Sequence, residues 1–176
     1  AHVDVVDNDG ISPLIGAIKG NFTDVAIYLL EHGANPNEIF VDDNGNEHNL
    51  LLDAVVESQI QFALKLLENG ADFSATDSDG VSIITHASFQ GIQEVVSFIL
   101  ESPLPLDLNK ANNGDGINAL IASSSEGHVD IVSMLLATGR VDENTSDNDG
   151  TTALMAASVR GHKDIVQLLV DVGVDV

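Results

Sequence analysis

The sequence contains no cysteine, and basic residues are scarce. Without cysteine the chain forms no disulfide, carries no thiol nucleophile and holds no cysteine-ligated zinc. Its 6 lysine and arginine residues face 28 acids, which gives a formal net charge of −22. A surface this acidic repels nucleic-acid phosphates and anionic membranes, so we expect neither as a partner. It attracts basic proteins or peptides, although high net charge also serves solubility alone.

Long hydrophobic runs are absent as well. A membrane-spanning helix needs roughly 20 consecutive apolar residues, so no membrane insertion is expected. No basic-then-apolar leader of the kind that directs secretion is visible, and we expect an intracellular protein, cytoplasmic or nuclear. The hydrophobic content of 44% is that of a folded chain, so disorder is not expected.

What the sequence does contain is a motif that recurs along its length. The loop glycines Gly80, Gly116 and Gly150 are 36 and 34 residues apart. A fixed period of this length indicates a stacked array in which no unit buries a core alone, and such arrays favour a binding surface over a reaction site. The clearest copy covers 147–157 (DNDGTTALMAA) and 161–169 (GHKDIVQLL), and weaker copies start at Asp7, near Asn44, at Asp77 and at Asn113.

Four short motifs recur in phase within these copies: a D-x-x-G turn, a Thr/Ser-x-Leu helix entry, Gly-His between two helices, and a closing Gly-Ala-Asn/Asp. Together they resemble the ankyrin repeat, which has a turn and two helices in about 33 residues. The resemblance implies an all-α solenoid of about five helix-turn-helix repeats with connecting hairpin-like turns. It places the repeats at about 7–39, 40–75, 76–111, 112–145 and 146–176.

The sequence departs from the family pattern in one respect: Thr-Pro-Leu-His is nowhere intact. Some hydrogen bonds between turn and helix are therefore expected to be missing, with the second repeat the weakest. We expect a single domain over 1–176 that is monomeric. Residues 2–5 and 173–176 look like repeats cut short, so the chain is interpreted as a slice of a longer protein.

The second helices show the apolar spacing of half-buried helices, and their stripes are interpreted as structural. The predicted stripes are Val25, Leu29 and Leu30; Phe62, Leu66 and Leu67; Val95, Ile99 and Leu100; Ile131, Leu135 and Leu136; and Ile165, Leu168 and Leu169.

The resemblance implies that the turn tips and the outward side of the first helices line a concave, partner-binding face. Acids at the tips stand beside aliphatic residues expected to face solvent, a pattern that a basic, partly apolar peptide complements. Solubility explains the tip acids equally well, and Phe89 either anchors a partner or packs against a neighbouring first helix. The predicted partner-binding residues are Asp9, Ile11, Lys19, Glu57, Asp79, Val81, Phe89, Gln90, Asp115, Ile117, Glu126, Asp149, Thr151 and Arg160. Asp7, Asp77 and Asp147 are assigned to local hydrogen bonding in the turns.

Two insertions are further candidates for partner contact, and three asparagines are candidates for modification. Segments 38–49 and 102–115 lengthen their turns, and insertions in repeat arrays often lie on the binding side. Phe40 and Val41 in the first insertion either contact a partner or tuck back onto the array. In some ankyrin repeats an intracellular oxygenase hydroxylates an asparagine, and the resemblance puts Asn37, Asn109 and Asn144 at that position.

Motifs for catalysis and metal binding are lacking. The D-x-D-G tips have no coordinating residue at the first EF-hand position, the histidines lack zinc-ligand spacing, and no P-loop, dinucleotide or nucleophile motif occurs. We expect no metal, no cofactor and no enzyme. The predicted function is a non-catalytic protein–protein interaction module. The alternative is a structural spacer or regulatory repeat segment of a larger enzyme, channel or scaffold protein.

Overall fold

The computed structural model describes residues 3–42 and 45–174, which form ten helices and one two-stranded sheet. The all-α repeat solenoid is confirmed. Contacts gather into two compact units, residues 1–73 and 74–176, while the single domain over 1–176 stays a prediction. Residue 2 of the first predicted cut repeat, and residues 175 and 176 of the last, lie outside the described residues.

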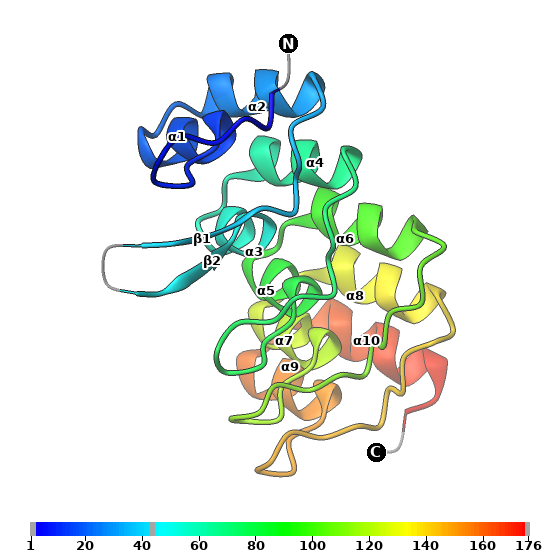
Figure 1. The fold of residues 1–176 in the computed structure, drawn as a ribbon. Coiled ribbons are helices and arrows are strands. Elements are labelled where there is room, and N and C mark those ends of the chain that lie inside the picture. Colours follow the sequence, from blue (N-terminus) through cyan, green and yellow to red (C-terminus); the bar gives the residue numbers. More distant parts are fainter. Residues whose placement is uncertain (1–2, 43–44, 175–176) are drawn as a thin grey trace. The chain divides into compact units, whose positions relative to one another are not determined.

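The first unit contains two helix pairs joined through a β-hairpin (Figure 1). Its strands are antiparallel, with Phe40 opposite His48, and both lie within the insertion at 38–49. The elements are α1 (Pro13–Lys19), α2 (Thr23–Glu31), β1 (Ile39–Val41), β2 (Glu47–Asn49), α3 (Leu50–Val56) and α4 (Ile60–Glu68).

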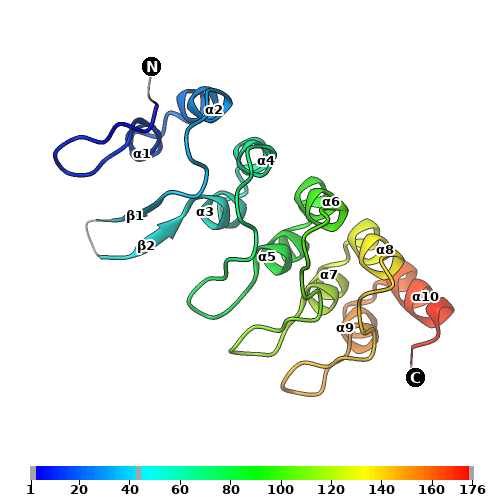
Figure 2. The ribbon, with the colours of Figure 1, turned by 45° about the vertical axis from the view of Figure 1, so that its right-hand side comes forward.

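The second unit contains three helix pairs. Figure 2 shows their first helices in one row and their second helices in another, with the turns projecting from the side of the first row. The helices are α5 (Ile83–Gln90), α6 (Gln93–Glu101), α7 (Ala119–Glu126), α8 (Val129–Ala137), α9 (Ala153–Arg160) and α10 (Lys163–Val172).

Every first helix begins at a residue whose side-chain oxygen accepts a hydrogen bond from the backbone N–H three positions later. Such a cap satisfies a donor that the first helical turn leaves unpaired. The bonds expected at the threonine position of the family motif are thus present at all five helix starts. At its histidine position Ile15, Leu52, Ile121 and Met155 have no hydrogen-bonding side chain, and Thr85 bonds to Ser82, so the bonding between turn and helix is partly missing as expected. The capping residues are Ser12, Asn49, Ser82, Asn118 and Thr152.

Most residues of the predicted stripes are buried, the leucines at 29, 100, 136 and 168 are half-buried, and one residue is exposed. Residues such as Phe62 and Ile131 are buried, as their spacing predicts. Val25 is 50% exposed, so its assignment to the buried stripe of α2 is wrong; Ala26 and Leu30 are the buried residues there. No described helix covers the face of α2 that carries Val25, whereas α4, α8 and α10 each lie against the second helix of a preceding repeat.

Candidate functional site

The turns before the first helices are stabilised by the side chain of their first residue, which accepts hydrogen bonds from backbone N–H groups later in the same turn. In the last turn, Asp147 Oδ1 accepts the backbone N–H groups of Asp149 at 3.0 Å and Thr151 at 2.7 Å. Asp7 and Asp77 do the same, which confirms their assignment to local hydrogen bonding. In the turn at 112–117 this role falls to Asn112, which the sequence reasoning missed.

Neighbouring turns of the second unit are hydrogen-bonded to one another. The backbone N–H of Asn113 donates to the carbonyl of Asp79, and that of Asn148 donates to the carbonyl of Asp115, both at 2.8 Å. Gly116 has φ +79°, and a Cβ there would lie 2.7 Å from Asn148 Oδ1, so both its conformation and its surroundings require glycine. These contacts hold the tip carboxylates of Asp79, Asp115 and Asp149 in an exposed row.

Two adjoining cavities lie beside this row, between the turns and the first helices. Their volumes are about 240 Å³ and about 300 Å³, and both are lined by Phe89, Ile117 and Ala122. We call the two cavities together the groove. The first is also lined by Val81, Thr85, His86 and Asn112, and the second by Ile121, Ser125, Asp147, Thr151, Ala156, Val159 and Arg160.

Five of the predicted partner-binding residues line the groove: Val81, Phe89, Ile117, Thr151 and Arg160. Glu126 lies beside it, with its carboxylate 3.9 Å from the Arg160 guanidinium, whereas Gln90 is half-buried and does not line it. The sequence reasoning missed Val159, which is 85% exposed. Its position directly before Arg160, at the outward end of α9, was the available signal.

The exposure predicted for the aliphatic row is wrong. Val81, Ile117 and Thr151, and Ile11 in the first unit, are half-buried and do not face solvent fully. The exposed apolar surface comes instead from the helix ends, where Phe89 is 54% exposed. The groove therefore has an aliphatic floor and an exposed aromatic side chain, an arrangement that receives apolar side chains of a partner.

A paired acid and imidazole lie at one end of the groove. His86 Nε2 is 2.8 Å from Asp77 Oδ2. Partial burial alone would raise the pKa of Asp77, but hydrogen bonds from the Val81 N–H, from His86 and from the Asp79 N–H lower it below its ordinary value. Asp77 is therefore an ionised turn-closing group, and the exposed tip acids are separate from it.

The other four predicted partner-binding residues belong to the first unit. Asp9 is exposed at the first turn tip, next to the half-buried Ile11. Lys19 Nζ stands 5.7 Å from the centroid of the Phe40 ring, and Glu57 lines a separate cavity of this unit. Phe40 is half-buried and stacks on His48, so it tucks back onto the unit, while Val41 is 52% exposed.

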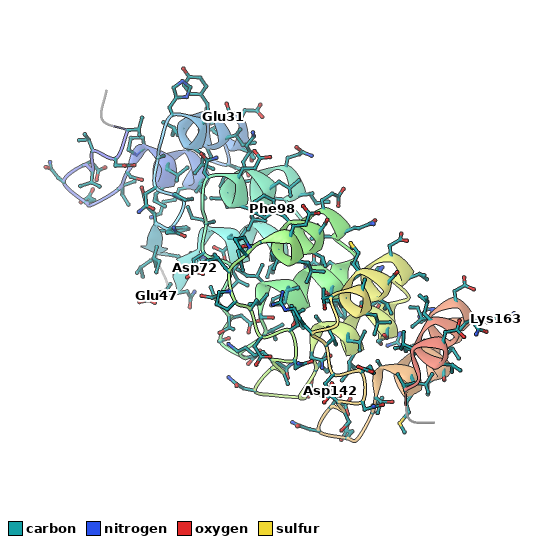
Figure 3. All side chains as sticks on the ribbon, turned by 90° about the vertical axis from the view of Figure 1, so that its right-hand side faces the viewer. Glu31, Glu47, Asp72, Phe98, Asp142 and Lys163 are labelled. Atoms are coloured by element: carbon teal, nitrogen blue, oxygen red, sulfur yellow. The ribbon has the colours of Figure 1, made fainter. Side chains whose placement is uncertain are left out.

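Asn37 and Asn109, which are among the asparagines proposed for hydroxylation, link consecutive repeats. Asn109 Nδ2 donates to the Arg140 carbonyl at 3.2 Å, and its Oδ1 accepts the N–H of Asp142 (labelled in Figure 3) at 2.7 Å. Asn37 makes the same two bonds with Gly70 and Asp72. Asn144 is exposed, and its N–H donates to Asp142.

Comparison with known proteins agrees with this architecture. The profile of the family described as ankyrin repeats (3 copies) matches residues 1–77 and 83–176. The chain is an ankyrin repeat protein. Ankyrin repeats are generally protein-interaction modules without catalytic activity.

Two solved ankyrin repeat structures are similar to this one. EF0377, described as an ankyrin repeat protein, is 34% identical, with a TM-score of 0.75 over 93% of this chain and 82% of that chain. An ankyrin repeat domain from Acinetobacter baumannii AYE is 27% identical, with a TM-score of 0.74 over 99% of this chain and 88% of that chain.

One curated relative is a potassium channel. The potassium channel AKT2/3 of Arabidopsis thaliana is 27% identical over 136 residues, which are 77% of this ankyrin repeat chain but 16% of the channel. None of the helices in the described ranges 3–42 and 45–174 has the length and apolar character needed to cross a bilayer. Within the same ranges, no group of three or more His, Asp or Glu side chains is placed to hold a metal ion.

Proposed function

We propose that this chain is a protein-interaction module that binds a basic, partly apolar peptide segment in the groove of residues 74–176. The observation that carries the proposal is the adjacency of two cavities with shared walls to a row of tip carboxylates. Apolar side chains of the segment enter beside Phe89 and Ile117. Its lysine or arginine residues lie along Asp79, Asp115 and Asp149.

The electrostatic part of the mechanism follows from the charge of the chain. With a net charge of −22, it attracts cationic segments from a distance and raises their association rate. Retention then depends on the apolar contacts, because exposed ion pairs contribute little affinity and are screened by salt. We therefore propose that the tip carboxylates set the association rate and the preference for basic segments. The apolar contacts in the groove set how slowly the segment dissociates.

Selection from a random peptide library tests this proposal and does not require the natural partner. The wild-type chain is expected to enrich peptides that combine two or more large apolar residues with an excess of lysine and arginine. A variant with Asp79→Lys and Asp115→Lys is expected to lose the basic preference and to bind the selected peptides more weakly. Enrichment of neutral or acidic peptides, or equal affinity of that variant at low salt, would refute the electrostatic part.

The resemblance to a plant potassium channel supports a second role, as a spacer or regulatory repeat segment of a larger protein. In that role the acids keep the array dispersed and the groove stays empty. Failure of the isolated chain to enrich any peptide over an unrelated ankyrin repeat protein would favour this role.

Hydroxylation of Asn37, Asn109 or Asn144 also stays a proposal, and extra oxygen in the intact mass of natively expressed protein tests it.

A further inference from the structure

The unit of residues 1–73 contains a cavity of its own, with a volume of about 240 Å³. The rings of Phe22, Phe40 and Phe62 form part of its wall. Phe22 is 63% exposed and Phe62 is 4% exposed, so the rings extend from the mouth of the cavity to its base. The polar part of the lining includes Asn21, His48, Asp53, Glu57 and Gln59.

The second unit shows why this space is open. There His128, which precedes the second helix α8, lies on Gly91 of the preceding repeat and bonds to the carbonyl of Phe89. In the first unit the corresponding positions are Gln59, which precedes α4, and Asn21. Gln59 Nε2 instead donates to Glu57 at 2.6 Å, and both Asn21 and Gln59 line the cavity. The first unit therefore has a glutamine side chain where the second unit has the imidazole ring of His128.

Two carboxylates line the cavity: Asp53, which is paired with His48, and Glu57, which is not. Glu57 is exposed, and the hydrogen bond from the neutral Gln59 amide does not neutralise its carboxylate. The unit has two lysine residues and no arginine, and neither lysine forms an ion pair with Glu57 in the described part of the chain, although Lys19 stands over Phe40 in the cavity wall. Lys65 lies between Glu31 at 3.3 Å and Glu68 at 2.8 Å, and Lys19 stands over the Phe40 ring.

We propose that this cavity binds the lysine or arginine side chain of a basic protein segment. The aliphatic stem of that side chain packs along Phe62 and Phe22, and its cationic head meets the face of the Phe22 ring and the carboxylate of Glu57. Aromatic faces and a carboxylate that has no basic partner within 3–42 and 45–174 favour a cation over a neutral or anionic group. The cavity shares no lining residue with the groove, so this site can be tested independently of the function proposed above.

Amide chemical-shift mapping on the full chain tests the site with two matched tripeptides. The first probe is N-acetyl-Gly-Lys-Gly-amide, and the second replaces lysine by norleucine, which keeps the stem and removes the charge. The lysine probe is expected to shift Asn21, Phe22, Glu57 and Gln59 in a saturable manner. The norleucine probe is expected to bind roughly five- to tenfold more weakly, because it lacks the charge-assisted hydrogen bond.

The variant Glu57→Gln is expected to reduce the affinity for the lysine probe by a similar factor. Glu47→Gln, which removes another exposed carboxylate of the same unit, from β2 and outside the cavity lining, is the control and should leave that affinity unchanged. Equal binding of the two probes, or an unchanged affinity in Glu57→Gln, would overturn the proposal. Butylammonium binding as tightly as the lysine tripeptide would overturn the assignment to a protein segment in favour of a small amine.

Discussion

The imidazole Nε2 of His128 lies 3.0 Å from the backbone carbonyl oxygen of Phe89 in the preceding repeat. The same ring covers Gly91, where a Cβ would come within 2.5 Å of the imidazole Cε1. His162 repeats the arrangement on the Ser125 carbonyl and Gly127. Each of these histidines therefore packs on a glycine of the preceding repeat and joins the two repeats. The contact of His128 also holds the end of α5, which carries Phe89.

Replacing Gly91 by alanine should destabilise the second unit in two ways. The left-handed backbone at φ +75° costs about 1 kcal/mol for alanine, and the clash with His128 adds about 1–2 kcal/mol. Gly150→Ala is the control, because Gly150 has φ +82° with no atom within 4 Å of its Cβ position. Urea unfolding followed by circular dichroism gives both free energies. In a His128→Ala background the cost of Gly91→Ala should fall to that of Gly150→Ala, and an unchanged cost would contradict the packing account.

Two serine hydroxyls in the second unit are expected to reduce stability. Ser88 and Ser124 are fully buried, and their Oγ atoms have no hydrogen-bond partner among the described residues. Ser124→Ala should therefore raise the free energy of unfolding by about 1 kcal/mol, because an unsatisfied buried polar group is removed. Ser123→Ala in the same helix is the control, since Ser123 Oγ donates to the Ala119 carbonyl. A larger gain from Ser123→Ala than from Ser124→Ala would argue against this explanation.

The asparagine links between repeats should also contribute to stability. Asn109→Ala removes both the bond to the Arg140 carbonyl and the bond to the Asp142 N–H. We expect a loss of about 1–2 kcal/mol in thermal or urea unfolding, since each such bond contributes about 1 kcal/mol net. A loss below about 0.3 kcal/mol would show that water replaces both bonds without cost.

The stability of the first unit should depend on pH through His48. Its imidazole lies 2.8 Å from Asp53 and 3.5 Å from Asp42, and the hydrogen bond to Asp53, opposed by burial and assisted by Asp42, raises the pKa of His48 above its ordinary value. A raised folded-state pKa gives stabilisation that is complete below the unfolded pKa of about 6.5 and is lost as pH rises through the folded value. The difference in unfolding free energy between wild type and His48→Ala should therefore be larger at about pH 6 than at about pH 8. An equal difference at both pH values would contradict the ion-pair role.

The local chemistry of the repeats could be predicted from the sequence, whereas exposure could not. Asp147 and Gly150 define their turn because the hydrogen bonds lie within five residues, so a short motif specifies them. The exposure of Val25 and the partial burial of Ile117 depend on which helix or turn lies beside them, which no local pattern specifies.

The candidate site was predictable to a similar degree. Family geometry placed Val81, Phe89, Ile117, Thr151 and Arg160 on one face, and all five line the groove. The depth of the groove depends on how side chains pack between turns and first helices, and the cavity of the first unit is lined by Gln59, which stands where the second unit has His128. Neither follows from the spacing of motifs.

Phe89 and the groove are proposed to hold an apolar part of a basic segment. The direct test is calorimetric titration of a library-selected peptide into wild type, Phe89→Glu and Val170→Glu. Val170 is the matched control, because it is an apolar residue of the same unit, is 46% exposed and does not line the groove. We predict that Phe89→Glu weakens binding by about 10- to 30-fold while Val170→Glu leaves it within about twofold, at both low and high salt. Equal effects of the two substitutions would contradict a role of Phe89 in holding the segment.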